Sequence, residues 1–191
     1  MTEIETFCPT GQDDWRQWLL ENHQSKSSIW LIYYKKKANT PTITHSEAVD
    51  EALCFGWIDG IRKTLDENRF IQFFCKRKPK SGWSKINKGK IKALIEKDLI
   101  APAGYEAIEI AKQNGSWTIL DEVEELIIPK DLAAAFKTQK GSKDFFLKLS
   151  KSAQKMILSW LVMAKRPETR LKRIHEIVES AAQKLKPIQF R

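Results

Sequence analysis

The residue with the clearest chemical potential in the sequence is Asp59, an isolated acid in the apolar run ALCFGWIDG, Ala52–Gly60. A carboxylate among apolar side chains suits acid–base work or ligand binding in a pocket. Asp before Gly is also a common turn pair, so Asp59 has a structural alternative in which it bonds nearby backbone. Both interpretations stay open here. For the first one, the candidate pocket residues are Trp57, Asp59, Trp83, Ser84 and Asn87.

A second candidate surface is basic. The net charge is +9, and residues 61–100 hold 12 Lys or Arg against 4 Asp or Glu. Ser84 is the expected N-cap of a helix, whose free N–H groups favour anions; Trp83 beside it stacks a base if it is exposed, or anchors the loop if it is buried. Such charge runs are also commonly solvated faces. The candidate residues for a polyanion, such as nucleic acid, or for an acidic protein are Arg62, Lys63, Arg77, Lys78, Lys80, Lys85, Lys88, Lys92, Arg166, Arg170 and Arg173.

Signatures of the common enzyme classes are absent. The sequence has no Walker A loop, no GxGxxG and no HExxH. Asp50, Glu51 and Asp59 could supply paired carboxylates, but their spacing does not say whether they converge, and acids on a helix surface are usually just solvated. We therefore expect no catalytic residues and no cofactor, and the balance is against an enzyme.

Cysteine and histidine usage argues against disulfides and metals. Three cysteines without a CxxC pattern, and three isolated histidines, predict no disulfide framework and no metal site. The first ten residues, MTEIETFCPT, lack the features of a secretory leader, and no run approaches the ~18 apolar residues of a membrane span. We expect a cytoplasmic protein without a membrane span.

The elements that must position these residues begin with a helix opened by Thr10 and Asp13 and a strand in Ser28–Lys37, whose last residues, Lys35–Lys37, leave the sheet for solvent. The strand is apolar at both alternating sets of positions, so we expect it to be central and covered on both faces. A capping box of Thr44 and Glu47 predicts a helix to Cys54, which ends at Gly56 in the left-handed conformation. Two strands follow as a hairpin, over Trp57–Thr64 and Arg69–Lys76, and then helices over Lys85–Lys97 and from Pro102 to Asn114.

The remainder of the chain reads as helical. We place a module boundary in the acidic connection 118–128, between modules 1–117 and 129–191. The expected C-terminal helices are Asp131–Lys137, Ser142–Leu149, Ala153–Lys165 and Pro167–Leu185, the last with Leu171, Ile174, Val178, Ala181 and Leu185 at core spacing. The predicted fold class is α+β: a small antiparallel sheet packed with helices, followed by an all-helical C-terminal module.

Three motifs carry a resemblance to a known family. The runs ALCFGWIDG, SGWSKIN (Ser81–Asn87) and AKRPETRLKRI (Ala164–Ile174) resemble the YdeI/OmpD-associated, or bacteriocin-protection, family, over nearly the whole chain. The resemblance implies a YjbR/CyaY-like N-terminal module, and it implies no reaction and no catalytic residues. Some YjbR-like relatives are described as DNA-binding. The frataxin-like CyaY relatives suggest iron, but this chain lacks the acidic helix for it.

Three functions compete at this level. The first is a non-enzymatic stress-resistance protein that binds a polyanion or an acidic partner through the basic residues. The second is a small-molecule-binding protein or enzyme with a cleft around Trp57, Asp59, Trp83 and Asn87. The third is an interaction module whose helical tail binds a protein through Arg166 and Arg170.

Overall fold

The computed structural model describes residues 5–191; the first four residues of the predicted 1–117 module lie outside the described residues. The chain forms two compact units. Unit 1 comprises the residues up to Ser81 together with Ile86–Asn114, and unit 2 comprises Gly82–Lys85 and Gly115–Arg191. Unit 1 is α+β and the C-terminal part is all-helical, as predicted.

Unit 1 is built on a four-stranded sheet with strand order β1-β2-β4-β3. Its strands are β1 (Thr6–Phe7), β2 (Ser28–Tyr34), β3 (Trp57–Thr64) and β4 (Arg69–Lys76). The predicted hairpin is confirmed, because β3 and β4 pair antiparallel, and β2 pairs antiparallel with β4. However, β1 runs parallel to β2, so the sheet is mixed and not purely antiparallel. A two-residue strand is too short to show a period of two in the sequence.

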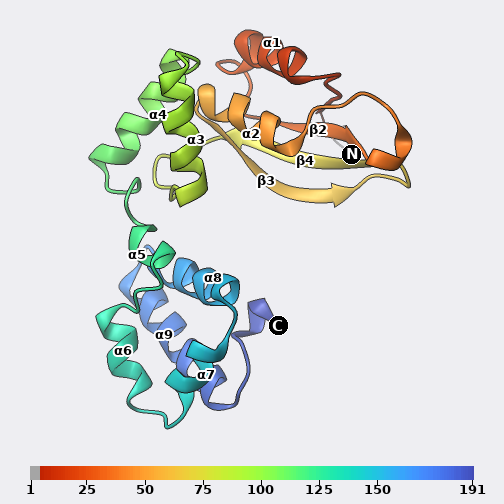
Figure 1. Ribbon diagram of the computed structural model, residues 1–191. Coiled ribbons are helices and arrows are strands. Elements are labelled where there is room, and N and C mark those ends of the chain that lie inside the picture. Colours follow the sequence, from red (N-terminus) through yellow and green to blue (C-terminus); the bar gives the residue numbers. More distant parts are fainter. Residues whose placement is uncertain (1–4) are drawn as a thin grey trace. The chain divides into compact units, whose positions relative to one another are not determined.

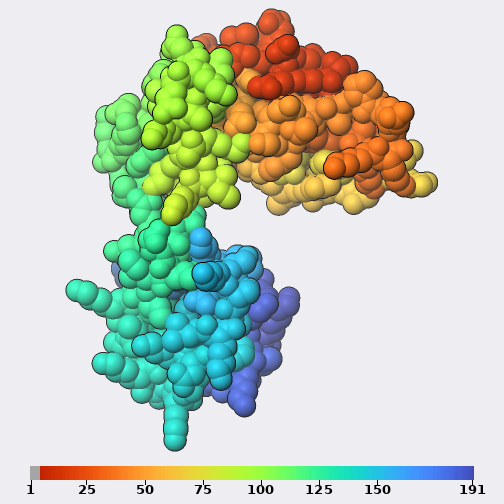
Figure 2. All heavy atoms as spheres, in the orientation of Figure 1, coloured from red at the N-terminus to blue at the C-terminus, as the bar shows by residue number. Residues whose placement is uncertain are grey.

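The helices of unit 1 are α1 (Gln12–Asn22), α2 (His45–Cys54), α3 (Lys85–Glu96, beginning in the unit 2 segment) and α4 (Pro102–Gln113), with a short 3-10 turn at Lys36–Ala38. Helices α1 and α2 lie on one side of the sheet (Figure 1). There Trp15 of α1 contacts Phe74 at 5.6 Å between ring centroids, and Trp18 contacts Trp57 at 5.9 Å. The atoms of α1, in red, pack against the orange segment that contains β2 and α2 (Figure 2).

Strand β2 shows that only this side of the sheet is covered. Ile29, Leu31 and Tyr33 are buried, whereas the alternate residues Trp30 and Ile32 are half-exposed. The prediction that β2 is central is confirmed, since it lies between β1 and β4. The prediction that both faces are covered is wrong, because the helices pack on one face only. The strand ends at Tyr34, in agreement with the prediction that Lys35–Lys37 leave the sheet.

Two local predictions around the sheet have different outcomes. The capping box of α2 is confirmed, with Thr44 and Glu47 exchanging backbone-to-side-chain hydrogen bonds. Gly56 then ends the helical segment at φ +70, and a Cβ there would lie 2.8 Å from the carbonyl oxygen of Ala103, so both conformation and packing require glycine. At α1 the prediction is wrong: the N-cap is Gly11, and the carboxylate of Asp14, not Asp13, accepts the hydrogen bonds of Thr10.

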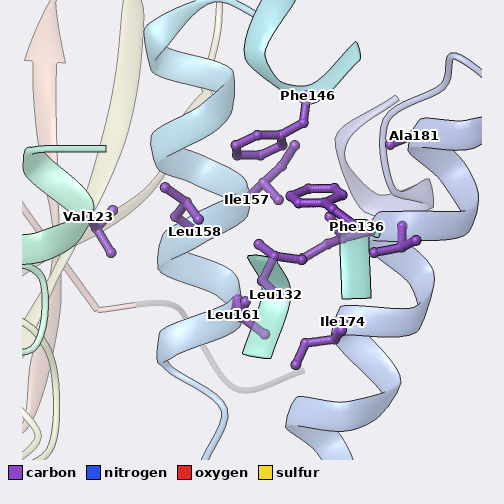
Figure 3. Close-up of a cluster of buried hydrophobic side chains, with 11 residues drawn as sticks. Val123, Leu132, Phe136, Phe146, Ile157, Leu158, Leu161, Ile174 and Ala181 are labelled. Carbon is purple, nitrogen blue, oxygen red and sulfur yellow. The ribbon is translucent and has the colours of Figure 1, made fainter. Parts of the chain in front are cut away.

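Unit 2 is a bundle of short helices: α5 (Asp121–Glu124), α6 (Lys130–Phe136), α7 (Ser142–Lys148), α8 (Lys151–Val162) and α9 (Pro167–Ala182), with a 3-10 turn at Ile188–Phe190. Phe136 and Phe146 meet at 5.4 Å between α8 and α9 (Figure 3). Val123 belongs to the same core, so the connection predicted as a linker contributes to this unit. Leu171 and Leu185 depart from their predicted core positions, being 70% and 42% exposed, and α9 ends before Leu185.

Candidate functional site

The uncovered face of the sheet in unit 1 is rich in aromatic side chains. Trp30 of β2 and Phe73 of β4 are directly opposite in the strand register, and their ring centroids are 5.2 Å apart. Both are half-exposed, as are Ile32 and Tyr34 on the same strand face. We call this surface the open face; its members on β2 and β4 are Ser28, Trp30, Ile32, Tyr34, Arg69, Ile71, Phe73 and Cys75.

The charged side chains of the open face are basic. In β3, Lys63 pairs with Ile71 and so belongs to this face, and its ammonium lies 5.0 Å from the centre of the Trp30 ring. At the other end, burial raises the pKa of the Cys75 thiol while the nearby cations of Lys78 and Arg77 oppose that rise. Among the described strand residues, alternation puts no acid on this face.

A bulge in β3 decides which of the two neighbouring cations faces the helices. The register of β3 against β4 shifts between Asp59 and Arg62. After the shift, Arg62 faces the helix side, where its guanidinium lies 3.5 Å from the centre of the Phe70 ring. Gly60, within the bulge, lies against Phe73, whose ring would be 3.1 Å from a Cβ. A bulge re-aims side chains in this way, so that Lys63, but not Arg62, serves the open face.

The other predicted basic residues are spread over both units. Arg77 is half-buried and is not a surface cation, and this burial lowers the pKa of its guanidinium to about 10. Lys78, Lys80 and Lys92 are exposed, and Lys88 is half-exposed. Lys85 belongs to unit 2, where its ammonium pairs with Glu125 at 3.2 Å.

The three arginines of the C-terminal motif do not form one free stripe. Arg170 forms two hydrogen bonds to the carboxylate of Asp131, at 2.6 and 3.0 Å. Arg173 stacks over Trp160 at 4.8 Å and donates to the Trp160 carbonyl. Arg166 is exposed at the N-cap of α9. Two of the three are therefore engaged within the bundle.

Asp59 is the centre of a small polar cluster on the helix side of the sheet. Its carboxylate is 3.1 Å from Nε2 of His45 and 3.5 Å from Nε2 of Gln72, which also donates to the Gly60 carbonyl at 2.6 Å. Tyr33 lies in the same neighbourhood: burial and the charge of Asp59 raise the pKa of its hydroxyl. Within the described part of the chain, this buried hydroxyl has no hydrogen-bond partner.

The remaining predicted pocket residues are divided between the units. Trp57 is fully buried in unit 1, where Asn87 also lies, half-exposed. Trp83 and Ser84 belong to unit 2. Trp83 is only 2% exposed, and its ring is 4.9 Å from that of Trp117. In this conformation Trp83 anchors a loop and offers no face on which a base stacks.

Sequence reasoning missed two features that the structure brings together. The sequence predicts that the strand of Trp30 is covered on both faces and places Phe73 in a hairpin strand, because alternation alone does not say which face a helix covers. Glu51 was considered a solvated helix acid, yet it is buried and accepts hydrogen bonds from Gln12 at 2.6 Å and Arg16 at 2.7 Å. Over residues 5–191, no three His, Cys, Asp or Glu side chains gather as a metal site would require.

Comparison with known proteins gives two family matches. Residues 7–107, more than half of the chain, match a domain of unknown function (DUF8412). Residues 125–184 match the family described as bacteriocin-protection, YdeI or OmpD-associated. The resemblance is thus confirmed for the C-terminal motif, while ALCFGWIDG and SGWSKIN lie in the other match. No curated protein and no solved structure matched. In the described residues, no helix is both long and apolar enough to cross a membrane.

Proposed function

The chain belongs to the DUF8412 family and carries a bacteriocin-protection, YdeI or OmpD-associated domain. Because neither family description names a ligand, we propose a function from the geometry of unit 1. The proposed function is binding of single-stranded nucleic acid on the open face. This narrows the polyanion hypothesis of the sequence and moves its stacking residues from Trp83 to Trp30 and Phe73.

The observation that carries the proposal is the half-exposed Trp30–Phe73 pair with Lys63 across it. The described strand residues of this face include no acid, and Asp66 of the β3–β4 turn pairs with Arg69 at one end of it. Every base has a π-face, so stacking on an aromatic side chain is tolerant of sequence and contributes about 1–3 kcal/mol per base. Lys63 lies 5.0 Å from the Trp30 ring and is suited to a phosphate beside a stacked base. A duplex keeps its bases stacked on one another, so its bases cannot reach the rings.

The test is anisotropy of labelled single- and double-stranded oligonucleotides, titrated with the full chain over a salt series. The variant Trp30→Ala should weaken single-strand binding at least about fivefold, the lower bound of one lost stacking contact. The matched control is Tyr105→Ala on α4, an aromatic side chain 41% exposed and away from the sheet. Circular dichroism of both variants establishes that the fold is retained.

Charge reversal tests the electrostatic part. Lys63→Glu should reduce the salt slope by about 0.7, the value for one lost phosphate contact to a single strand. Lys97→Glu, an exposed lysine outside the sheet, is the control for net charge. Equal effects of the two reversals, or equal binding by the Trp30 and Tyr105 variants, would refute the proposal. Binding that depends on charge but not on Trp30 would mean that the chain contacts the phosphates without stacking the bases, which also contradicts the proposal.

Two expectations from the sequence, a YjbR/CyaY-like fold and a cytoplasmic location, are compatible with nucleic-acid binding. A YjbR/CyaY-like fold for unit 1, with DNA-binding described for some relatives, supports it as an analogy of fold. A cytoplasmic location would place the protein where nucleic acid is available.

A further inference from the structure

The turn between α8 and α9 holds an open pocket that the proposed function does not use. Its volume is about 360 Å³, and it is lined by Met163, Lys165, Arg166, Thr169 and Arg173. Four of these five residues belong to the motif AKRPETRLKRI. The sequence pattern therefore concentrates its side chains around this pocket.

The charges that line the pocket are all positive. Lys165, Arg166 and Arg173 supply three cations, and the five lining residues include no carboxylate. Glu168, the nearest acid in the sequence, lines a different groove of α9 and not this pocket. Three cations around one pocket repel one another, and an anion bound among them would offset that repulsion.

Arg173 is positioned before any ligand arrives. Its guanidinium is held over the Trp160 ring, and one N–H donates to the Trp160 carbonyl. A guanidinium has five N–H donors in a fixed fork, so donors remain for a ligand. The half-buried Thr169 adds a hydroxyl, whereas the exposed Lys165 and Arg166 add mobile charge. One fixed and two adaptable cations are suited to a compact, highly charged group.

We propose that this pocket binds the phosphate group of a small phosphate monoester. At pH 7 such a group carries close to two negative charges and three acceptor oxygens, which match three cations and a hydroxyl. A phosphodiester, as in a nucleic-acid backbone, carries only one charge. The pocket volume lies at the lower end of the range of about 300–1,000 Å³ for ligand sites, which fits a small molecule. This site lies in unit 2 and is independent of the open face.

The experiment is calorimetric titration of the full chain, at constant ionic strength, with inorganic phosphate, phenyl phosphate and diphenyl phosphate. One site per chain is expected, with phenyl phosphate and inorganic phosphate bound more tightly than the diester. The double variant Lys165→Gln/Arg166→Gln should weaken phenyl phosphate binding about tenfold or more, the loss expected for one charged hydrogen bond. Both residues are exposed, so the fold should tolerate the change.

The matched control is Lys172→Gln, an exposed lysine on the same helix outside this pocket. It should leave phosphate binding unchanged, and Trp30→Ala should do the same. If neither inorganic phosphate nor phenyl phosphate nor diphenyl phosphate shows saturable binding, the proposal is overturned. An equal loss in Lys172→Gln and the double variant would also overturn it, as would tighter binding of the diester.

Discussion

The buried ion pair between Arg16 of α1 and Glu51 of α2 should decide much of the stability of unit 1. The two side chains meet at 2.7 Å, with the Glu51 side chain 3% exposed and that of Arg16 28% exposed. Arg16 also donates to the Leu99 carbonyl at 3.0 Å, so it joins α1 to the connection between α3 and α4.

The two members of this pair should respond unequally to substitution. Arg16→Met keeps an apolar stem but leaves the carboxylate of Glu51 buried without its cation. Removing one partner of a buried pair costs about 3–5 kcal/mol, and the partial exposure of Arg16 puts the expected loss near the lower end. Glu51→Gln leaves an arginine that water can reach, so the loss should be about 1 kcal/mol. The double variant Arg16→Met/Glu51→Leu should recover most of the loss.

The assay must report on unit 1 alone, because a chain of two units does not guarantee two-state unfolding. Native-state hydrogen exchange at the amides of β2 and β4 meets this requirement. The control is Lys112→Met, which removes an exposed pair with Glu109 of the same 2.7 Å length. Exposed pairs contribute at most about 1 kcal/mol. If Arg16→Met costs no more than Lys112→Met, burial does not govern this pair and the reasoning fails.

Two further predictions concern single polar groups. Tyr33→Phe should leave stability unchanged or raise it by up to about 1 kcal/mol, since the buried hydroxyl has no partner among the described residues. Because the pKa of Tyr33 is raised from 10.0, the wild-type chain should also lose stability as pH rises above 10, and the variant should not. A variant less stable by more than about 1 kcal/mol at pH 7 would mean that the hydroxyl is hydrogen-bonded. Asp131→Asn should cost unit 2 about 0.5 kcal/mol at pH 7, because it removes the pair with Arg170, which holds the pKa of the Asp131 carboxyl below 3.8. The stability of the wild-type unit should fall as pH drops through that lowered pKa. Hydrogen exchange at the amides of α9 measures this, and an equally steep fall in the variant would contradict the prediction.

Local signals predicted the parts of the fold that local interactions determine. The capping box of Thr44 and Glu47, the left-handed Gly56 and the β3–β4 hairpin depend on residues within a few positions of one another. Their sequence signatures are accordingly strong. The short β1 strand left no such signature, because its pairing with β2 joins segments more than twenty residues apart.

The candidate sites were predictable only in part. The residue types were identified, since Lys63, Arg166 and Arg173 are all in the sequence-based set of cations. Which of them share a surface was not predicted. Alternation places the neighbours Arg62 and Lys63 on opposite faces, but the bulge in β3 decides that Lys63 lies on the open face. The assignment of Trp83 as a stacking residue depended on exposure, a property of the whole unit.

The sequence by itself determined the types of the longer elements, the excess of positive charge and the motif of the YdeI/OmpD-associated family, because these follow from composition and short-range order. Only the tertiary structure decided which side of β2 the helices cover, and hence that Trp30 and Phe73 stay accessible. It also decided that Glu51 is buried with Arg16, while Arg173 is fixed against Trp160 beside an open pocket. Burial and convergence arise from packing between distant segments, and the order of residues along the chain does not record them.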